Sequence, residues 1–152
     1  MLTEEFKSAL IKVFPLVILD EKGQYLTIST DACQSHELLS YLKNNADPQF
    51  QKLECLSGVD WPEHMEVDYH LDAIHTNDSV VVKAKINTRE NPEIDSVIDL
   101  WKGAELLECE VYDFFGVRFS NHPFLRRLFL NENWIGYPLR KDYVDEINMI
   151  KL

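Results

Sequence analysis

The sequence is poor in glycine and in positive charge, and each shortage argues against a class of function. Only five glycines occur in 152 residues, and no two of them stand close together. Phosphate-cradling loops and dinucleotide fingerprints need clustered glycines so that the backbone can approach the ligand closely. We therefore expect no nucleotide site of the usual kind. The formal net charge of −11 repels nucleic acid and anionic membrane surfaces, so we expect neither as a general partner.

Cysteines and long apolar runs are also scarce. Cys33, Cys55 and Cys109 are far apart and odd in number, which provides no disulfide framework and matches neither a zinc nor an iron–sulfur spacing. This usage suits a reducing compartment. No apolar run approaches the roughly 20 residues that cross a bilayer. The first fifteen residues mix charged and apolar side chains, which is typical of an amphipathic helix and not of a signal peptide, so we expect a protein that stays in the cytosol.

Hydrophobic periodicity predicts a single α+β domain, in which helices cover a mixed or antiparallel sheet and an extended segment follows at the C-terminus. A chain of 152 residues that is 45% hydrophobic is long enough for one core and short for two. Helical spacing occurs at residues 2–14, 31–45 and, with a break near Gly103, 95–115, and strand patterns occur at residues 16–20, 25–30, 51–61, 65–75 and 79–86. We therefore place a core at residues 1–115 and an extended docking segment at residues 116–152 of the same domain.

Alternation along the strands predicts which residues face the core. Asp68, His70 and Asp72 are expected together on the solvent face of their strand, and Cys55 on the core side of the preceding one. Asp31 is placed to cap the helix that follows it. The core-facing residues expected in the most secure hairpin are Val67, Tyr69, Leu71 and Ala73 on one strand and Val80, Val82, Ala84 and Ile86 on the other.

The segment from Gly116 onward differs in kind from the rest of the chain. It lacks a steady period, yet it is rich in large apolar residues, whereas disordered tails are normally poor in them. Residues 118–143 carry a net charge of +3, and the remainder carries −14. Arginine and aromatic residues together are enriched at protein–protein hot spots. Such a segment needs a surface to lie on, either that of its own domain or that of a partner.

One group of residues invites a catalytic hypothesis. Asp60, His64 and His70 lie among several carboxylates and could serve a stand-alone metal-dependent hydrolase. Their spacing also suits a solvated strand face, which is the commoner arrangement. No serine or cysteine stands in a nucleophile-elbow context, so we expect no catalytic, cofactor-binding or metal-binding residues in this chain.

The stretch from Leu106 to Tyr143 carries an ordered set of motifs. It contains Glu-Cys-Glu, Asp-Phe-Phe-Gly, His-Pro, Leu-Arg-Arg, Trp-Ile-Gly and Pro-Leu-Arg-Lys-Asp. In this order the motifs resemble the signature of the thirty-kilodalton subunit, the C-type subunit, of respiratory NADH:quinone oxidoreductase, complex I. Cys109 departs from the pattern, because the family usually has Arg there, and Asn121 stands where Gly is common. The residues that match the signature most specifically are Glu108, Glu110, Asp113, Gly116, His122, Pro123, Arg126, Arg127, Trp134, Gly136, Pro138, Arg140, Lys141 and Asp142.

The resemblance implies a cofactor-free subunit of the peripheral arm of a proton-translocating complex. Its partners would be the quinone-site subunit, which is the D-type subunit of the complex, and other peripheral-arm subunits. Its role would be to brace the quinone-reducing module. NADH, flavin, iron–sulfur clusters and quinone would belong to the assembled complex. The chain would reach the membrane only through that complex, on the cytoplasmic side of the bacterial inner membrane, and the signature residues are then expected at a partner interface.

Two alternatives stay open at this point. A homologous subunit of a membrane-bound hydrogenase or of a ferredoxin-linked complex would share the signature, so the electron donor is undetermined. The arginines of the segment could also pair with carboxylates of their own domain, for example Asp113 and Glu110. Both pairings are open for Arg126 and Arg127, whereas a partner is favoured for Arg140 and Lys141 because they lie near the chain end.

Overall fold

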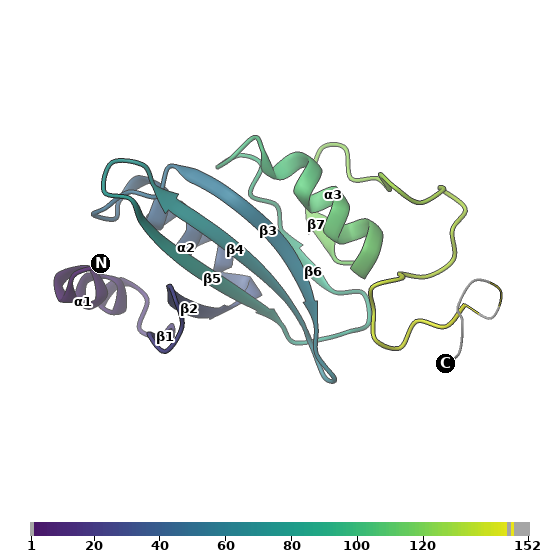
Figure 1. Ribbon diagram of the computed structural model, residues 1–152, viewed down its shortest axis with the longest axis horizontal. Coiled ribbons are helices and arrows are strands. Elements are labelled where there is room, and N and C mark those ends of the chain that lie inside the picture. The colour runs from purple at the N-terminus through teal and green to yellow at the C-terminus, as the bar shows by residue number, and fades with distance from the viewer. Residues whose placement is uncertain (1, 146, 148–152) are drawn as a thin grey trace.

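Alternating apolar residues build a five-stranded mixed sheet at the centre of the molecule (Figure 1). The computed structural model describes residues 2–145 and 147. The strand order in the sheet is β1-β2-β5-β4-β3, and β6 and β7 form a separate parallel pair. The elements are α1 (Glu4–Val13), β1 (Ile18–Asp20), β2 (Leu26–Asp31), α2 (Ala32–Asn44), β3 (Lys52–Asp60), β4 (Met65–Ala73), β5 (Asp78–Ile86), β6 (Glu93–Asp95), α3 (Ala104–Phe115) and β7 (Arg118–Ser120). The predicted α+β class with a mixed sheet and one domain is confirmed.

The β4–β5 hairpin is the most regular part of the sheet, as its alternation predicts. All nine residues of β4 pair with β5 in antiparallel register, from Met65 opposite Ile86 to Ala73 opposite Asp78. Asn77, in the turn, takes a positive φ of 57°, which asparagine tolerates better than most residues. The eight residues predicted to face the core are all buried.

The helices α1 and α2 contribute the apolar residues that complete the core. Leu38, Leu39 and Leu42 of α2 are fully buried, and Phe6 and Leu10 of α1 join the same cluster. Figure 1 shows α2 behind the sheet and α1 at the end of the molecule opposite to the C-terminal segment. The helix α2 carries the chain away from β2, so β2 pairs in parallel with β5 and not with its successor in sequence.

Three local predictions were wrong in whole or in part. Asp31 stands at the N-cap of α2 as predicted, but its side chain makes no capping hydrogen bond; its Oδ1 accepts a hydrogen bond from Asn87 Nδ2 at 3.2 Å. A register shift between Leu53 and Cys55 in β3 exposes Cys55 and buries Leu56 instead, since a bulge reverses the alternation that follows it.

The third error concerns residues 95–103, which are not helical. Asp95 ends β6, and α3 begins only at Ala104. The side chain of Glu108 explains the difference, because it accepts hydrogen bonds from Ser96 Oγ at 2.6 Å and from the Val97 N–H at 2.7 Å. These bonds hold the backbone before α3 in a turn, which a periodicity argument cannot detect. Within the described residues, no helix has the length and apolar character needed to cross a membrane.

The outer face of β4 is less exposed than predicted. Asp68 is only 9% exposed, and Lys83 Nζ lies 3.6 Å both from its carboxylate and from that of Glu66. Burial and the negative charge of Glu66 raise the pKa of Asp68 to about 6, although Lys83 opposes the shift. Because the folded pKa lies above the ordinary value of 3.8, folding becomes less favourable as pH rises through this window.

We therefore expect that Asp68→Asn raises the free energy of unfolding at pH 7.5 by about 1–2 kcal/mol and changes it little at pH 4.5. Urea unfolding at both pH values measures the effect. Asp72→Asn is the matched control on the same strand, and it removes a carboxylate that accepts the Ser79 hydroxyl at 2.6 Å; we expect no gain from it at pH 7.5. Equal stability of the wild type and Asp68→Asn at pH 7.5 would contradict the expectation.

Candidate functional site

The buried carboxylate of Asp113 on α3 holds the segment that follows the helix. Its Oδ2 accepts the backbone N–H groups of Leu128, Phe129 and Leu130 at 3.0, 2.8 and 3.1 Å. Its Oδ1 accepts Arg127 Nη1 at 3.0 Å. Burial tends to raise the pKa of Asp113, but these hydrogen bonds outweigh it and lower the pKa below 3.8. The stability that this carboxylate contributes is therefore present at neutral pH and is lost only as pH falls below 3.8.

Arg127 extends the same anchor to later residues of the segment. Its Nη2 donates to the carbonyl oxygens of Trp134 and Gly136, both at 3.0 Å, and its side chain is only 11% exposed. The guanidinium of Arg127 thus connects Trp134, Gly136 and its own part of the segment to Asp113 on α3. Of the two pairings open for Arg127, the structure has the one with Asp113 of its own domain. We call the described residues 116–145 the C-terminal ribbon.

A second anchor joins the end of the ribbon to the sheet. Asp60, at the end of β3, receives Arg89 Nε at 2.9 Å, Arg89 Nη2 at 2.8 Å and the backbone N–H of Lys141 at 2.9 Å. Arg89 Nη2 also lies 3.2 Å from Asp142 Oδ1. Burial opposes ionisation of Asp60, but the bonds from Arg89 and Lys141 lower its pKa overall. The Pro-Leu-Arg-Lys-Asp motif therefore binds this chain's own body.

Arg140 and Tyr137 lie between the two anchors. Arg140 Nε donates to the Phe115 carbonyl at 2.6 Å and Nη1 to the Arg89 carbonyl at 3.3 Å. The Tyr137 ring lies 5.0 Å from the guanidinium carbons of both Arg127 and Arg140, which is within the range of cation–π attraction. These two bonds to carbonyl oxygens use only some of the N–H donors of Arg140, so the others could still bind a partner carboxylate. Its expected contact with a partner carboxylate stays a prediction.

Ring packing leaves no room for a side chain at Gly116. This residue has φ 74°, and a Cβ built there would lie 2.5 Å from Cε2 of Tyr137. Only glycine satisfies both the left-handed backbone and the contact. The glycine of the signature therefore allows the ribbon to return closely across the end of α3.

Glu108, Cys109 and His122 form a buried polar cluster beside the first turn of the ribbon. His122 Nδ1 accepts the Phe124 N–H at 3.1 Å, which assigns the ring proton to Nε2, 3.0 Å from the Glu105 carbonyl. The Cys109 thiol donates to the Phe124 carbonyl at 3.6 Å. Burial raises the pKa of Glu108, although the bonds from Ser96 and Val97 counteract it. All three side chains have protein partners, and the cluster positions the backbone around Phe124.

The outer side of the ribbon exposes several large apolar residues, and a grouping of such residues can mark an interaction surface. Lys141 Nζ lies 5.7 Å from the Trp61 ring, and Arg126 Nη1 donates only to the Phe124 carbonyl at 3.2 Å. Neither cation has a carboxylate partner within the described part of the chain. The exposed large apolar residues described at this end are Leu106, Phe124, Phe129, Ile135, Leu139, Val144 and Ile147.

The remaining residues predicted at a site divide into exposed and packed positions. Glu110 and Pro123 are exposed, whereas Trp134, Gly136 and Pro138 are half-buried in the ribbon. Residues 146 and 148–152 of the predicted docking segment lie outside the described residues. The structure thus brings most of the signature together at one end of the molecule, where the ribbon lies beside α3 (Figure 1).

The alternative hydrolase site is not assembled. Asp60 pairs across the sheet with Met65, whereas His70 lies five positions further along β4 and hence on the opposite face. His64 stacks on Trp61 with ring centroids 5.9 Å apart. Among the described residues, no group of three or more His, Cys, Asp or Glu side chains is arranged to hold a metal ion.

Sequence reasoning missed two groups that complete the anchors. Arg89 binds Asp60 from 29 positions away, and Ser96 binds Glu108 across the turn before α3. Neither belongs to the signature. A buried carboxylate needs donors, but the burial of Asp60 and Glu108 became known only from the structure, so no signal in the sequence pointed to these two partners.

A family model described as the 30 Kd subunit of the respiratory-chain NADH dehydrogenase matches residues 28–147. The chain is 44% identical over 126 residues to the C/D subunit of NADH-quinone oxidoreductase from Phocaeicola vulgatus, and the match covers 82% of this chain and 24% of that protein. It is 37% identical over 146 residues to NADH-ubiquinone oxidoreductase subunit 9 of Reclinomonas americana, covering 92% and 70% of the two chains. The chain thus spans about a quarter of the length of the C/D relatives.

The fold also occurs in a solved respiratory assembly. A chain in the structure of the membrane-bound sulfane sulfur reductase, an archaeal respiratory membrane complex, superposes with a TM-score of 0.74 at 25% sequence identity. The match covers 95% of this chain and 86% of the other. Similarity in sequence and similarity in structure thus both lead to components of respiratory enzymes.

Proposed function

The chain belongs to the family of the 30-kDa subunit, the C-type subunit, of respiratory NADH dehydrogenase, and from this membership we propose that it is a docking subunit of an NADH:quinone oxidoreductase. In this proposal it contributes no catalytic group of its own. It braces the quinone-reducing module and holds neighbouring subunits in register. The observation that carries the proposal is the C-terminal ribbon, which is anchored to its own domain by hydrogen bonds and exposes apolar and basic side chains outward.

The anchors make the ribbon suitable for docking because they reduce the entropy lost on association. A segment without regular secondary structure normally has to be ordered when it binds, which weakens affinity. Here Asp113 and Asp60 order it in advance through hydrogen bonds from Arg127, from Arg89 and from backbone N–H groups of the ribbon. Phe124, Phe129 and Ile135 would then be the apolar anchors of the interface.

We propose the D-type, quinone-site subunit as the direct partner. The Phocaeicola vulgatus relative carries the designation C/D, and this chain matches only 24% of it. A single polypeptide with both designations is expected to hold the two parts next to each other. Other peripheral-arm subunits would contact the remaining surface, and any association with the cytoplasmic side of a membrane would be peripheral and mediated by the complex.

The cofactors of the proposed reaction would lie in other subunits. Flavin and iron–sulfur clusters would carry the electrons from NADH to quinone, and three buried groups of this chain that could ligate a metal, Glu108, Cys109 and Asp113, make internal hydrogen bonds instead. A related complex with another electron donor is the second candidate, and the similarity to a chain of the sulfane sulfur reductase complex favours it. The two candidates differ in the subunits that co-purify, namely NADH-binding subunits in one and a different donor module in the other.

Removing apolar anchors from the ribbon should weaken docking without unfolding the domain. We expect that Ile135→Asp, at a position 89% exposed, lowers affinity for the D-type subunit of the same genome by about tenfold or more, because a buried charge replaces an interface anchor. Biolayer interferometry with immobilised D-type subunit measures the affinity, and thermal unfolding of the isolated chain should stay unchanged.

Ile74→Asp is the matched control. Ile74 is 58% exposed and follows the end of β4 opposite to the one that reaches Asp60. Its replacement should leave the affinity within about twofold of the wild type. Absence of binding by the wild-type chain, or equal loss with both variants, would speak against docking through the ribbon.

A further inference from the structure

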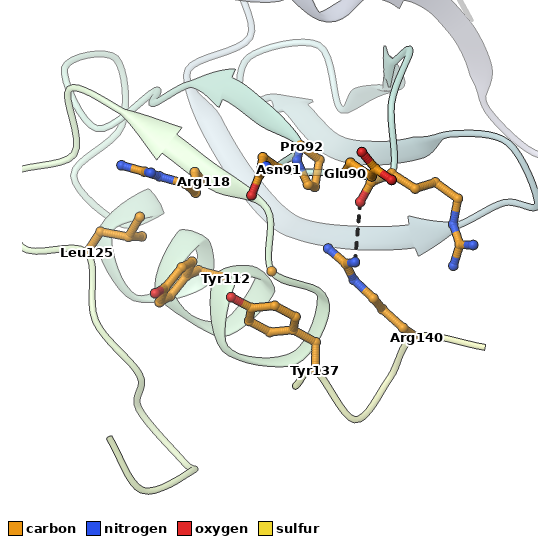
Figure 2. Close-up of a pocket in the computed structure, with 10 residues that line it drawn as sticks. Glu90, Asn91, Pro92, Tyr112, Arg118, Leu125, Tyr137 and Arg140 are labelled. Atoms are coloured by element: carbon orange, nitrogen blue, oxygen red, sulfur yellow. Dashed lines mark hydrogen bonds between the residues drawn. The ribbon is translucent and has the colours of Figure 1, made fainter. Parts of the chain in front are cut away.

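A cavity of about 650 Å³ lies where the C-terminal ribbon crosses the loop before β6 (Figure 2). Residues 89–92 and the end of α3 form one part of its wall, and Leu125, Tyr137 and Arg140 of the ribbon form another. The cavity therefore exists only while the ribbon is anchored. It is separate from the exposed apolar positions Ile135 and Phe129, which do not line it.

The cavity contains hydrogen-bond donors that have no acceptor among the described residues. The backbone of Arg118 is fixed because its N–H donates to the Pro92 carbonyl at 2.8 Å. Its guanidinium is exposed and makes no hydrogen bond or ion pair with any described residue. The hydroxyl groups of Tyr112 and Tyr137, whose rings pack edge to face at 6.3 Å, likewise have no hydrogen-bond partner in the described part of the chain. The two half-buried phenols and the exposed arginine therefore keep their donors available to a ligand oxygen.

The charge of the cavity favours an anion. Arg89 is neutralised by Asp60 and Asp142, at 2.8 and 3.2 Å. Arg140 donates two bonds to carbonyl oxygens and has no carboxylate within 4.0 Å among the described residues, and a guanidinium has about five N–H donors in all. Glu90 is the single carboxylate of the lining, against the unneutralised Arg118 and Arg140.

The walls favour a carboxylate on a polypeptide over a phosphate. The end of α3 at Gly116 forms part of the wall, and the C-terminal end of a helix carries partial negative charge, which disfavours a doubly charged anion. Figure 2 shows Arg118 and Arg140 on opposite sides, with the rings of Tyr112 and Tyr137 between them. An extended segment can reach both sides, and Leu125 supplies apolar surface for methylene groups.

We infer that this cavity receives an acidic side chain, Asp or Glu, from an extended segment of the partner subunit, with Arg118 and the two tyrosine hydroxyls as its donors. The inference rests on the proposed function, since it specifies the chemistry by which the docked subunit is recognised. It adds a charge-dependent contact to the apolar contacts of Ile135 and Phe124. Such a contact selects the correct partner more than it strengthens binding in general.

The test compares Arg118→Gln and Tyr112→Phe with the wild type in binding to the D-type subunit at low and high salt. We expect Arg118→Gln to weaken binding about tenfold, because a charge-assisted bond is lost, and Tyr112→Phe to weaken it about threefold. The effect of Arg118→Gln should shrink at high salt. Lys22→Gln, which removes an exposed cation in the connection between β1 and β2, is the control and should bind as the wild type does.

The outcomes separate this inference from the proposed function. If the wild type fails to bind the D-type subunit, docking itself is refuted. If the wild type binds and Arg118→Gln binds equally well, docking stands and the acidic contact is refuted. Calorimetry with inorganic phosphate provides the third outcome: tight phosphate binding that Arg118→Gln abolishes, with unchanged subunit affinity, would assign the cavity to a small anion and overturn the inference.

Discussion

Asp113→Ala is expected to lower the free energy of unfolding by about 3–5 kcal/mol, because it breaks a buried ion pair from one side. The change removes the acceptor for three backbone N–H groups and for Arg127, whose side chain is 11% exposed. A mostly buried guanidinium without its carboxylate is costly, because it loses both its counter-charge and its hydration. In a domain of this size the midpoint of thermal unfolding should fall by about 10 °C.

Hydrogen exchange localises the effect of this substitution. The amides of Leu128, Phe129 and Leu130 should exchange much faster in Asp113→Ala through local opening of the ribbon. The amides of the β4–β5 hairpin should exchange faster only by the amount that the lower free energy of global unfolding allows. Glu110→Ala, three positions earlier on the same helix and exposed, is the control and should change stability by less than about 0.5 kcal/mol. Unchanged exchange of the three ribbon amides in Asp113→Ala would contradict the role assigned to this carboxylate.

Gly116→Ala is expected to cost about 2–4 kcal/mol, the sum of a left-handed backbone strain and a clash with Tyr137. The added Cβ would lie 2.5 Å from the ring. Tyr137 cannot move away freely, since guanidinium groups lie 5.0 Å from its ring, one from Arg127 and one from Arg140. The ribbon should therefore be displaced locally, and affinity for the D-type subunit should fall together with stability.

Gly103→Ala is a closely matched control for this effect. Gly103 stands just before α3, has φ −63°, and a Cβ there meets no atom within 4 Å. We expect a change within about 0.5 kcal/mol. In a Tyr137→Leu background, Gly116→Ala should cost only the backbone strain, about 1–2 kcal/mol. Equal costs in both backgrounds, measured by urea unfolding, would show that the clash with the ring is not the cause.

The regular elements were predictable because their signals are local. Alternation identified the β4–β5 hairpin and its eight core residues, and helical spacing identified α1 and α2. Alternation failed at Cys55, where a bulge in β3 exposes the thiol, since one extra residue reverses every later orientation. The short strands β6 and β7 were missed because Ile94 and Phe119 pair across a long stretch of chain, and strands this short carry no period.

The candidate site was predictable as a set of residues but not as an arrangement. The signature identified Asp113, Arg127 and Gly116, yet whether Arg127 would face a partner or its own domain depended on Asp113 being buried beside it. Arg89, which lies outside the signature, could not be assigned to Asp60 from sequence, because the bond spans 29 positions. Contacts between distant segments depend on the packing of the whole domain, and single-sequence patterns do not contain that information.

The position of the ribbon in the proposed assembly can be tested by site-specific photo-crosslinking in the native complex. A photo-reactive amino acid at Ile135, 89% exposed, should yield a covalent conjugate with the D-type subunit, identified by mass spectrometry of the solubilised complex. The same group at Ile74 should yield none with that subunit. Recovery of the chain as a free monomer, or a conjugate with the D-type subunit from Ile74 and not from Ile135, would contradict docking through the C-terminal ribbon.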